Sequence, residues 1–100
     1  MTRAIAWSER ALADFESQFD FIARASLNNA NLVADRIEHS ISLLADTPFG
    51  RAGRVAGTYE ASVPKAPFII AYELPDDRTL GIRRIIHTSR HWPAGAWPND

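Results

Sequence analysis

The pattern of apolar and polar positions divides the chain into a helical front half and a β-rich back half. In the front half, apolar residues recur every three or four positions with charged residues between them, the period of an amphipathic helix. We predict helices over residues 9–25 and 29–45. Their apolar stripes are Leu12, Phe15, Phe19 and Ile22, and then Val33, Ile37, Ile41 and Leu44. The short link between them favours an antiparallel helical hairpin.

Signals at the helix ends support both predictions. Ser8 follows a short β-prone segment, residues 5–7, and is suited to cap the first helix. Glu9 lies in the first turn of that helix, where negative charge is favourable. Residues 26–29 carry turn and cap chemistry, and we expect the second helix to end before Pro48.

Beyond the helices the period changes to alternation. A flexible basic loop is expected over residues 50–54, and every second residue over 55–63 then shares one face of a predicted strand. The apolar, β-forming run 68–74 is bounded by prolines and predicts a strand covered on both faces. A turn at 76–78 leads into a third predicted strand over 80–87.

These elements predict an α+β domain with the order β-α-α-β-β-β. A helical hairpin is expected to pack on one face of a small, mainly antiparallel sheet. We expect residues 1–100 to form a single domain, in which residues 88–100, with two Trp-Pro pairs, make an irregular C-terminal tail.

This layout leaves one sheet face without a cover. Two helices cover only one face, yet the alternation places Ile69, Ala71 and Ile85 on the other. The sequence leaves two alternatives for how this face is covered. The tail, with Trp92 and Trp97, folds back over the face, or a partner protein lays an apolar segment across it.

Composition narrows the class of protein. The 100-residue chain has no cysteine, which excludes a disulfide framework and a thiolate metal site. Charged residues near the N-terminus interrupt the apolar run before it reaches the length of a signal peptide. The longest apolar run, residues 68–72, is far shorter than the ~20 residues of a membrane span. We therefore expect a cytoplasmic protein. Because no glycine-rich phosphate-binding loop appears, we also expect it to use no cofactor.

The charges are unevenly distributed along the chain. Residues 1–49 hold four basic and seven acidic residues, whereas 50–100 hold seven basic and five acidic ones, and ten of the eleven cations are arginine. Residues 78–98 contain four arginines, two histidines and no carboxylate. The stretch 83–93 mixes cations with an aromatic residue, as a contact to nucleic acid or to an acidic protein does. A solvated strand end explains it almost as well.

Two kinds of chemistry compete with ordinary surface roles for the charged residues of the back half. A metal site is disfavoured because His87 and His91 have a ligand spacing that suits only a helix, and a strand is predicted there. General acid-base cleavage of RNA needs a proton acceptor, a proton donor and cations. The candidates for these roles are Glu60 or Glu73, His87 or His91, and Arg83, Arg84 and Arg90. Nothing in their spacing forces them together.

Three blocks of sequence carry a family resemblance. Residues 50–60, 67–72 and 84–93 resemble, in order and spacing, the ParE toxins of bacterial toxin-antitoxin systems, within the RelE/ParE superfamily. The N-terminal helices, which open with Trp7 and Ala11, fit the same pattern, so the resemblance spans nearly the whole chain. It implies the RelE-like fold, whose element order is the one predicted above.

The resemblance also implies a function and partners. It implies the toxin of a type II toxin-antitoxin system, neutralised by a ParD-type ribbon-helix-helix antitoxin that wraps the toxin and alone contacts operator DNA. The implied target is DNA gyrase, trapped as a cleaved gyrase–DNA complex, with growth arrest and a role in plasmid maintenance. Inhibition by binding, not catalysis, is implied. We assign target binding to Arg83, Arg84, His87, Arg90, His91 and Trp92, and antitoxin binding to Ile69, Ala71 and Ile85.

The sister branch of RelE and YoeB provides the alternative function. Members of that branch cleave mRNA on the ribosome. Their lysines would fall on Glu60 and Ser62 and their sheet arginine on Ile69, while Trp92 stands in the region of their terminal tyrosine. Much of the nuclease set is therefore missing. Because His87 and Arg90 remain, an mRNA interferase is the second hypothesis, and a non-toxic interaction module is the third.

Overall fold

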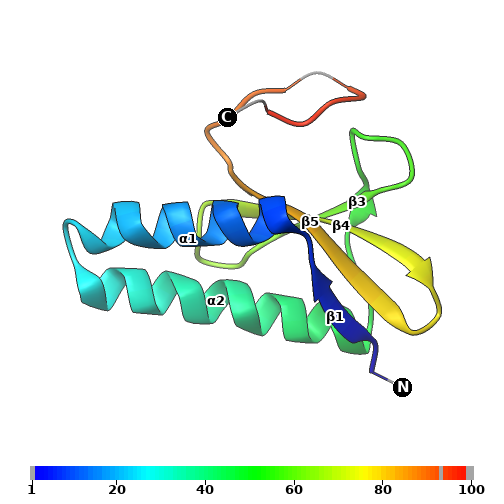
Figure 1. Cartoon of the computed structure of the whole chain (residues 1–100), viewed down its shortest axis with the longest axis horizontal. Coiled ribbons are helices and arrows are strands. Elements are labelled where there is room, and N and C mark those ends of the chain that lie inside the picture. The colour runs from blue at the N-terminus through cyan, green and yellow to red at the C-terminus, as the bar shows by residue number, and fades with distance from the viewer. Residues whose placement is uncertain (1, 93, 99–100) are drawn as a thin grey trace.

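Two helices pack against one face of a five-stranded sheet in the computed structural model of the chain (Figure 1), which describes residues 2–92 and 94–98. The elements are β1 (Ala4–Trp7), α1 (Glu9–Ala23), α2 (Leu27–Asp46), β2 (Arg51–Ala52), β3 (Tyr59–Ser62), β4 (Phe68–Asp76) and β5 (Thr79–His87). The sheet order is β1-β5-β4-β3-β2. β1 runs parallel to β5, and the other neighbours are antiparallel. The predicted α+β class and helical hairpin are confirmed.

Both helices begin at serine caps. The Ser8 hydroxyl accepts a hydrogen bond from the backbone N–H of Ala11 at 3.0 Å, and the Ser26 hydroxyl accepts one from Asn29 at 3.1 Å. A cap of this kind stabilises a helix by about 1 kcal/mol. Because Ser26 is the cap, α2 begins two residues before the predicted start.

The segment 50–63 differs from its prediction. Residues 51–52 form β2 and pair with β3, although a flexible loop was predicted there, and the strand predicted over 55–63 is confined to 59–62. Residues 53–58 form the turn that joins β2 to β3. The Gly53 N–H donates to the Thr58 carbonyl at 2.8 Å, and Gly57 has a φ of 80°, which favours glycine. The alternating pattern of the sequence therefore begins within this turn, which is why the strand was predicted to start too early.

A β-bulge in β5 overturns one predicted face. Ala71 of β4 lies opposite Arg84, but the next residue, Tyr72, lies opposite Ile82, so Arg83 is an extra residue without a partner. Beyond the bulge each side chain of β5 points to the opposite face from the one alternation predicts. The prediction that Ile85 lies on the far face is wrong, because Ile85 joins the core under the helices.

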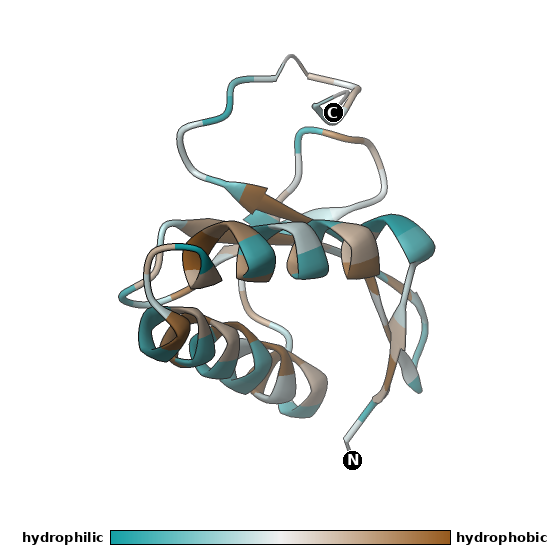
Figure 2. Cartoon of the chain, turned by 60° about the vertical axis from the view of Figure 1, so that its left-hand side comes forward, coloured by the Kyte–Doolittle hydropathy of each residue, from teal (hydrophilic) through white to brown (hydrophobic). Residues whose placement is uncertain are grey.

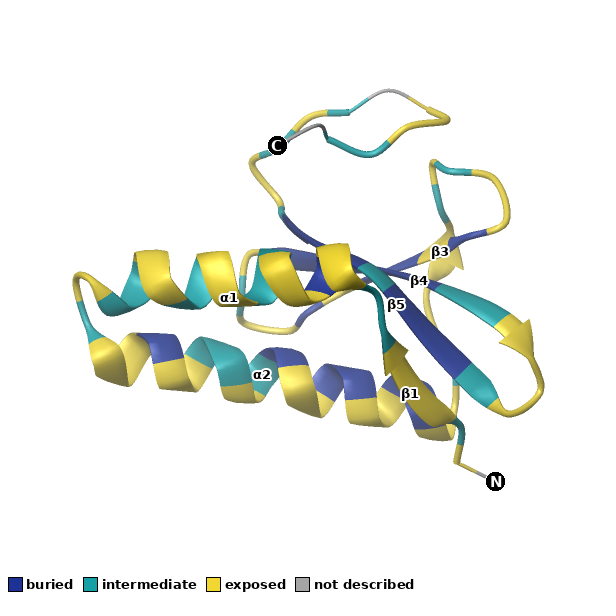
Figure 3. Cartoon of the chain, in the orientation of Figure 1, coloured by how far each residue is buried: buried dark blue, intermediate teal, exposed yellow. Residues whose placement is uncertain are grey.

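The core lies between the helices and the sheet. α2 contributes buried Ile37, Ile41 and Leu44, whereas in α1 only Ala11 is buried (Figure 3). Polar and apolar positions alternate around both helices, as their predicted stripes require (Figure 2). Leu12, placed on the predicted stripe, is exposed, because the start of α1 lies against β5 with the small Ala11 at the contact.

The tail turns back toward the β2–β3 hairpin and β5. Gly95 donates its N–H to the carbonyl of Arg54 at 2.7 Å, so the tail turns back beside the β2–β3 hairpin (Figure 1). The Arg54 guanidinium lies 3.8 Å from the centre of the Trp92 ring, and that of Arg83 lies 5.6 Å from the Trp97 ring. The sequence left open whether the tail or a partner protein covers the far face, and these contacts favour the tail.

Candidate functional site

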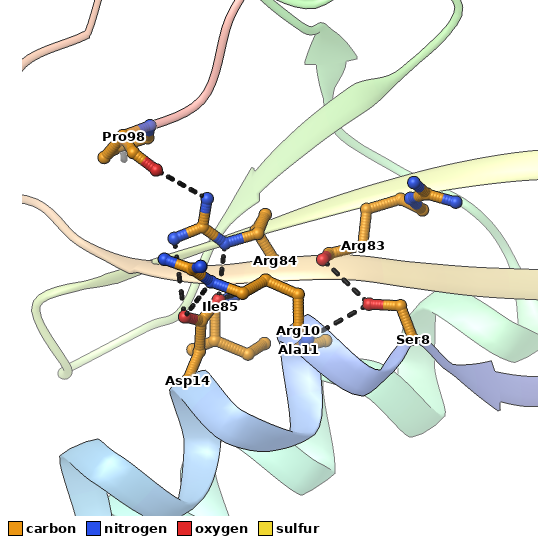
Figure 4. A network of polar contacts seen from close by, with 8 residues as sticks. All are labelled: Ser8, Arg10, Ala11, Asp14, Arg83, Arg84, Ile85 and Pro98. Carbon is orange, nitrogen blue, oxygen red and sulfur yellow. Dashed lines mark hydrogen bonds and ion pairs between the residues drawn. The ribbon is translucent and has the colours of Figure 1, made fainter. Parts of the chain in front are cut away.

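A buried ion pair lies at the centre of the basic end of the molecule, which we define as residues 83–92 (Figure 4). Arg84 Nε donates to Asp14 Oδ2 at 2.7 Å, and Arg84 Nη2 lies 3.4 Å from Asp14 Oδ1. The third guanidinium nitrogen, Nη1, donates to the carbonyl of Pro98 at 2.9 Å. The two side chains are only 7% and 11% exposed. The pair therefore joins α1, β5 and the tail.

Asp14 lies where backbone groups along the edge of β5 have no neighbouring strand to pair with. The parallel partner β1 ends at Trp7, which leaves the rest of β5 with backbone groups that need partners. Ser8 donates its hydroxyl to the Arg83 carbonyl at 2.9 Å, and Asp14 Oδ2 accepts the Ile85 N–H at 3.0 Å (Figure 4). Side chains of the first turns of α1 thus replace a strand along this edge.

The predicted target-binding residues differ in burial and in their partners. Arg84 is buried and held by Asp14 and Pro98, and Arg83 is half-exposed, 3.4 Å from Glu73. His91 is exposed, and Trp92 is half-buried beneath the Arg54 guanidinium. The six residues therefore differ in how far they reach the surface, although they share one end of the fold.

One polar cavity brings three of the six together. It has a volume of about 160 Å³ and lies between α1, the end of β5 and the tail, and we call it the polar cavity. Its lining residues are Asp14, Ser17, Gln18, Arg84, Ile85, Ile86, His87, Arg90 and Pro98. The contribution of α1 to this cavity was not predicted, because in the sequence Asp14 resembles any other residue of the polar face of the helix.

The candidate carboxylates for RNA cleavage lie elsewhere. Glu60 is buried on the far face, where it accepts the Arg54 N–H at 2.9 Å and lies 3.4 Å from the Arg51 guanidinium. Its charge fixes the β2–β3 hairpin. Glu73 pairs with Arg83, and neither glutamate lines the polar cavity that contains His87. The structure does not bring the acid-base candidates into one site.

The perturbed pKa values also lie away from the polar cavity. Burial, and to a smaller extent the nearby Tyr59, raises the pKa of Tyr72, whose hydroxyl donates to the Phe49 carbonyl. Hydrogen bonding to the Arg78 backbone lowers the pKa of Asp76 in the β4–β5 turn. Within residues 2–92 and 94–98, no cluster of three or more histidine or carboxylate side chains is placed to hold a metal ion.

The predicted antitoxin-binding residues are covered by the chain itself. Ile69 and Ala71 lie on the far face and are 6% and 0% exposed, and Ile85 is in the core. A different apolar surface is open. A groove of about 300 Å³ runs between the two helices and the adjoining ends of β4 and β5, and we call it the helix groove. It is lined by Gln18, Phe21, Ile22, Asn29, Leu32, Val33, Arg36, Pro67, Phe68 and His87.

The helix groove was not predicted, although the sequence holds a signal for it. Phe21 and Leu32 are 67% and 47% exposed, and both lie off the predicted apolar stripes. Apolar residues outside the stripe of an amphipathic helix mark a second contact surface. None of the helices described in the structure is long and apolar enough to span a bilayer.

The fold and the sequence match a known class of protein. A chain of the chromosomal ParDE TA system from P. aeruginosa has the same fold, with a TM-score of 0.76 over 86% of this chain and 96% of that chain, at 19% identity. Residues 5–92 match the sequence profile described as the ParE toxin of type II toxin-antitoxin systems, parDE. The chain therefore belongs to the ParE toxin family. None of the curated proteins matches it.

Proposed function

We propose that this ParE-type toxin acts in the cytoplasm as an inhibitor of DNA gyrase, which it traps as a cleaved gyrase–DNA complex. The observation that carries the proposal is the family match over residues 5–92. The basic end, with Arg83, Arg90 and His91 reaching the surface to different extents, supports contact with a negatively charged partner.

Inhibition by binding is also favoured by how the charged groups are used. Glu60 holds the β2–β3 hairpin, Glu73 pairs with Arg83, and Arg84 is held by Asp14. A general acid-base mechanism needs a donor and an acceptor within hydrogen-bond reach of one substrate. Because these groups are engaged in separate structural contacts, their arrangement favours a toxin that inhibits its target by binding.

For the antitoxin we propose the helix groove as the docking site, in place of the far face that the sequence favoured. The occupant is the amphipathic tail of a ParD-type antitoxin, which the ParDE system implies. Exposed Phe21 and Leu32 offer apolar contacts, and Arg36, which lines the groove, supplies a cation. An antitoxin segment that carries apolar and acidic residues complements this surface.

The proposal is tested by expression in bacteria. Expression of the toxin alone is expected to arrest growth with blocked replication, and co-expression of the antitoxin encoded beside it is expected to restore growth. Arrest with intact replication and cleaved ribosome-bound mRNA would instead establish the RelE-like alternative. No arrest by a folded, unaccompanied chain would contradict both toxin hypotheses.

A further inference from the structure

We propose that the antitoxin and the target compete for one wall of the molecule, formed by Gln18 of α1 and His87 of β5. The antitoxin then neutralises the toxin by excluding the target directly, without a change in the conformation of the toxin. The proposal rests on the proposed function, because it takes the helix groove as the antitoxin site and the basic end as the target site. It adds how occupation of the first site prevents use of the second.

The helix groove and the polar cavity share this wall. Gln18 and His87 are the two lining residues that the groove and the cavity have in common. His87 also belongs to the basic end, where the sequence assigned it to target binding. A segment that fills the helix groove as far as His87 therefore reaches the surface that we propose for the target.

The His87 ring is held in one orientation. It packs edge-on against the buried Phe68 ring, with the ring centroids 5.3 Å apart, and its Nδ1 accepts the Ser89 N–H at 3.1 Å. The backbone that follows is also fixed, because the Thr88 N–H donates to the Pro67 carbonyl at 2.8 Å. Two partners therefore meet the same face of a ring that does not turn from one to the other.

The ring also has one hydrogen to share. Because Nδ1 of His87 accepts the Ser89 N–H, the hydrogen of the neutral ring is assigned to Nε2, which is then a donor. A single N–H makes one strong, well-aligned hydrogen bond. An acceptor on the antitoxin and an acceptor on the target therefore compete for the same donor.

The second wall residue, Gln18, lies on a helix that is fastened to the sheet. One turn before it, the Asp14 carboxylate accepts hydrogen bonds from Arg84 Nε at 2.7 Å and from the Ile85 N–H at 3.0 Å (Figure 4). A movement of α1 against β5 would have to break this buried pair, which is strongly unfavourable. The structure therefore favours direct competition over an allosteric change that travels from the groove to the basic end.

The experiment measures the affinity of the antitoxin tail for the full chain at increasing concentrations of purified gyrase. The probe is a fluorescent peptide that corresponds to the C-terminal half of the antitoxin encoded beside the toxin. Competition raises the apparent Kd of the peptide in proportion to the gyrase concentration, whereas an allosteric coupling levels off, typically at about 5- to 150-fold. We expect the proportional rise. A plateau, or an unchanged Kd in a complex of all three components, would overturn direct exclusion and leave gyrase as the target.

Variants test the shared wall whatever the target is. Gln18→Ala and His87→Ala should each lower the antitoxin affinity about tenfold and also weaken growth arrest, because arrest reports contact with the target. Leu43→Ser, at an exposed leucine of α2 outside both sites, is the control and should change neither.

These variants also separate the two proposals. If the free toxin does not bind gyrase, the proposed target is wrong, and the variants alone decide whether the wall is shared. Loss of both antitoxin affinity and growth arrest, in variants that circular dichroism shows to be folded, supports the shared wall. Loss of only one of them, or of neither, would overturn it.

Discussion

Asp14 and Arg84, seventy residues apart in the sequence, form a buried ion pair that fastens α1 to β5. The same carboxylate accepts the Ile85 N–H, and the same guanidinium reaches the Pro98 carbonyl. One contact therefore fixes the relative positions of the helical hairpin, the sheet edge and the tail. The polar cavity exists because these three parts meet at this pair.

Breaking the pair should destabilise the protein strongly. Asp14→Asn leaves the Arg84 guanidinium buried without its counter-charge, and removal of one partner of a buried pair costs about 3 kcal/mol or more. Urea unfolding monitored by circular dichroism measures the loss. Asp20→Asn, an exposed position on the same helix, is the control and should change stability by less than ~0.5 kcal/mol. Equal effects of the two changes would contradict the structural role of the pair.

Two leucines of α2 offer a matched test of the helix groove. Leu32, in the groove, and Leu43, outside it, are 47% and 45% exposed. Leu32→Ser should weaken antitoxin binding by about 2 kcal/mol, roughly 30-fold, as loss of an interface anchor does. Leu43→Ser should leave the affinity unchanged, and calorimetric titration with the antitoxin compares them. Similar affinities of the two variants would place the antitoxin elsewhere.

The contact between Trp92 and Arg54 should hold the tail on the sheet. Trp92→Ala removes a cation–π contact worth about 1 kcal/mol between the tail and Arg54. Hydrogen exchange should then speed up at the Gly95 amide, which donates to the Arg54 carbonyl, while the amides of β4 and β5 remain protected. Unchanged exchange at Gly95 would show that Trp92 does not anchor the tail.

The raised pKa of Tyr72 predicts a loss of stability in alkali. Because burial raises the pKa in the folded state above the ordinary value near 10, the stability that depends on the neutral hydroxyl is intact below pH ~10 and is lost as the pH rises further. Tyr72→Phe also removes the hydrogen bond to the Phe49 carbonyl, which lowers stability at neutral pH by about 1 kcal/mol. Its unfolding free energy should therefore fall less steeply above pH ~10. An unchanged alkaline slope would contradict the prediction.

The spacing of apolar residues and the capping and breaking residues beside them correctly predicted α1 and the central strand β4. The helical stripes and Ser8 located α1, and the proline-bounded apolar run located the central strand β4. The error at Ile85 arose because a bulge adds one residue and leaves no trace in the apolar pattern. Alternation assigns faces correctly only as long as the register is unbroken.

The site was predicted only in part, because it is made by long-range contacts. The arginines and His87 of the basic end were recognised as a group, but the partner that buries Arg84 lies on a helix seventy residues away. Nothing near Asp14 distinguishes it from the other acidic residues of α1. Likewise, the sequence left two covers for the far face open, and the contacts of Trp92 and Trp97 are needed to choose the tail.

The most direct test of the central claim is a supercoiling and cleavage assay with purified gyrase, plasmid DNA and this chain. We predict blocked supercoiling, accumulation of cleaved plasmid, and reversal by the antitoxin. The folded double variant Arg83→Gln and Arg90→Gln, which spares the buried Arg84, should lose most of this activity, and Arg78→Gln should keep it. Normal supercoiling with no cleaved plasmid, at concentrations of the folded chain that saturate its antitoxin, would contradict the account.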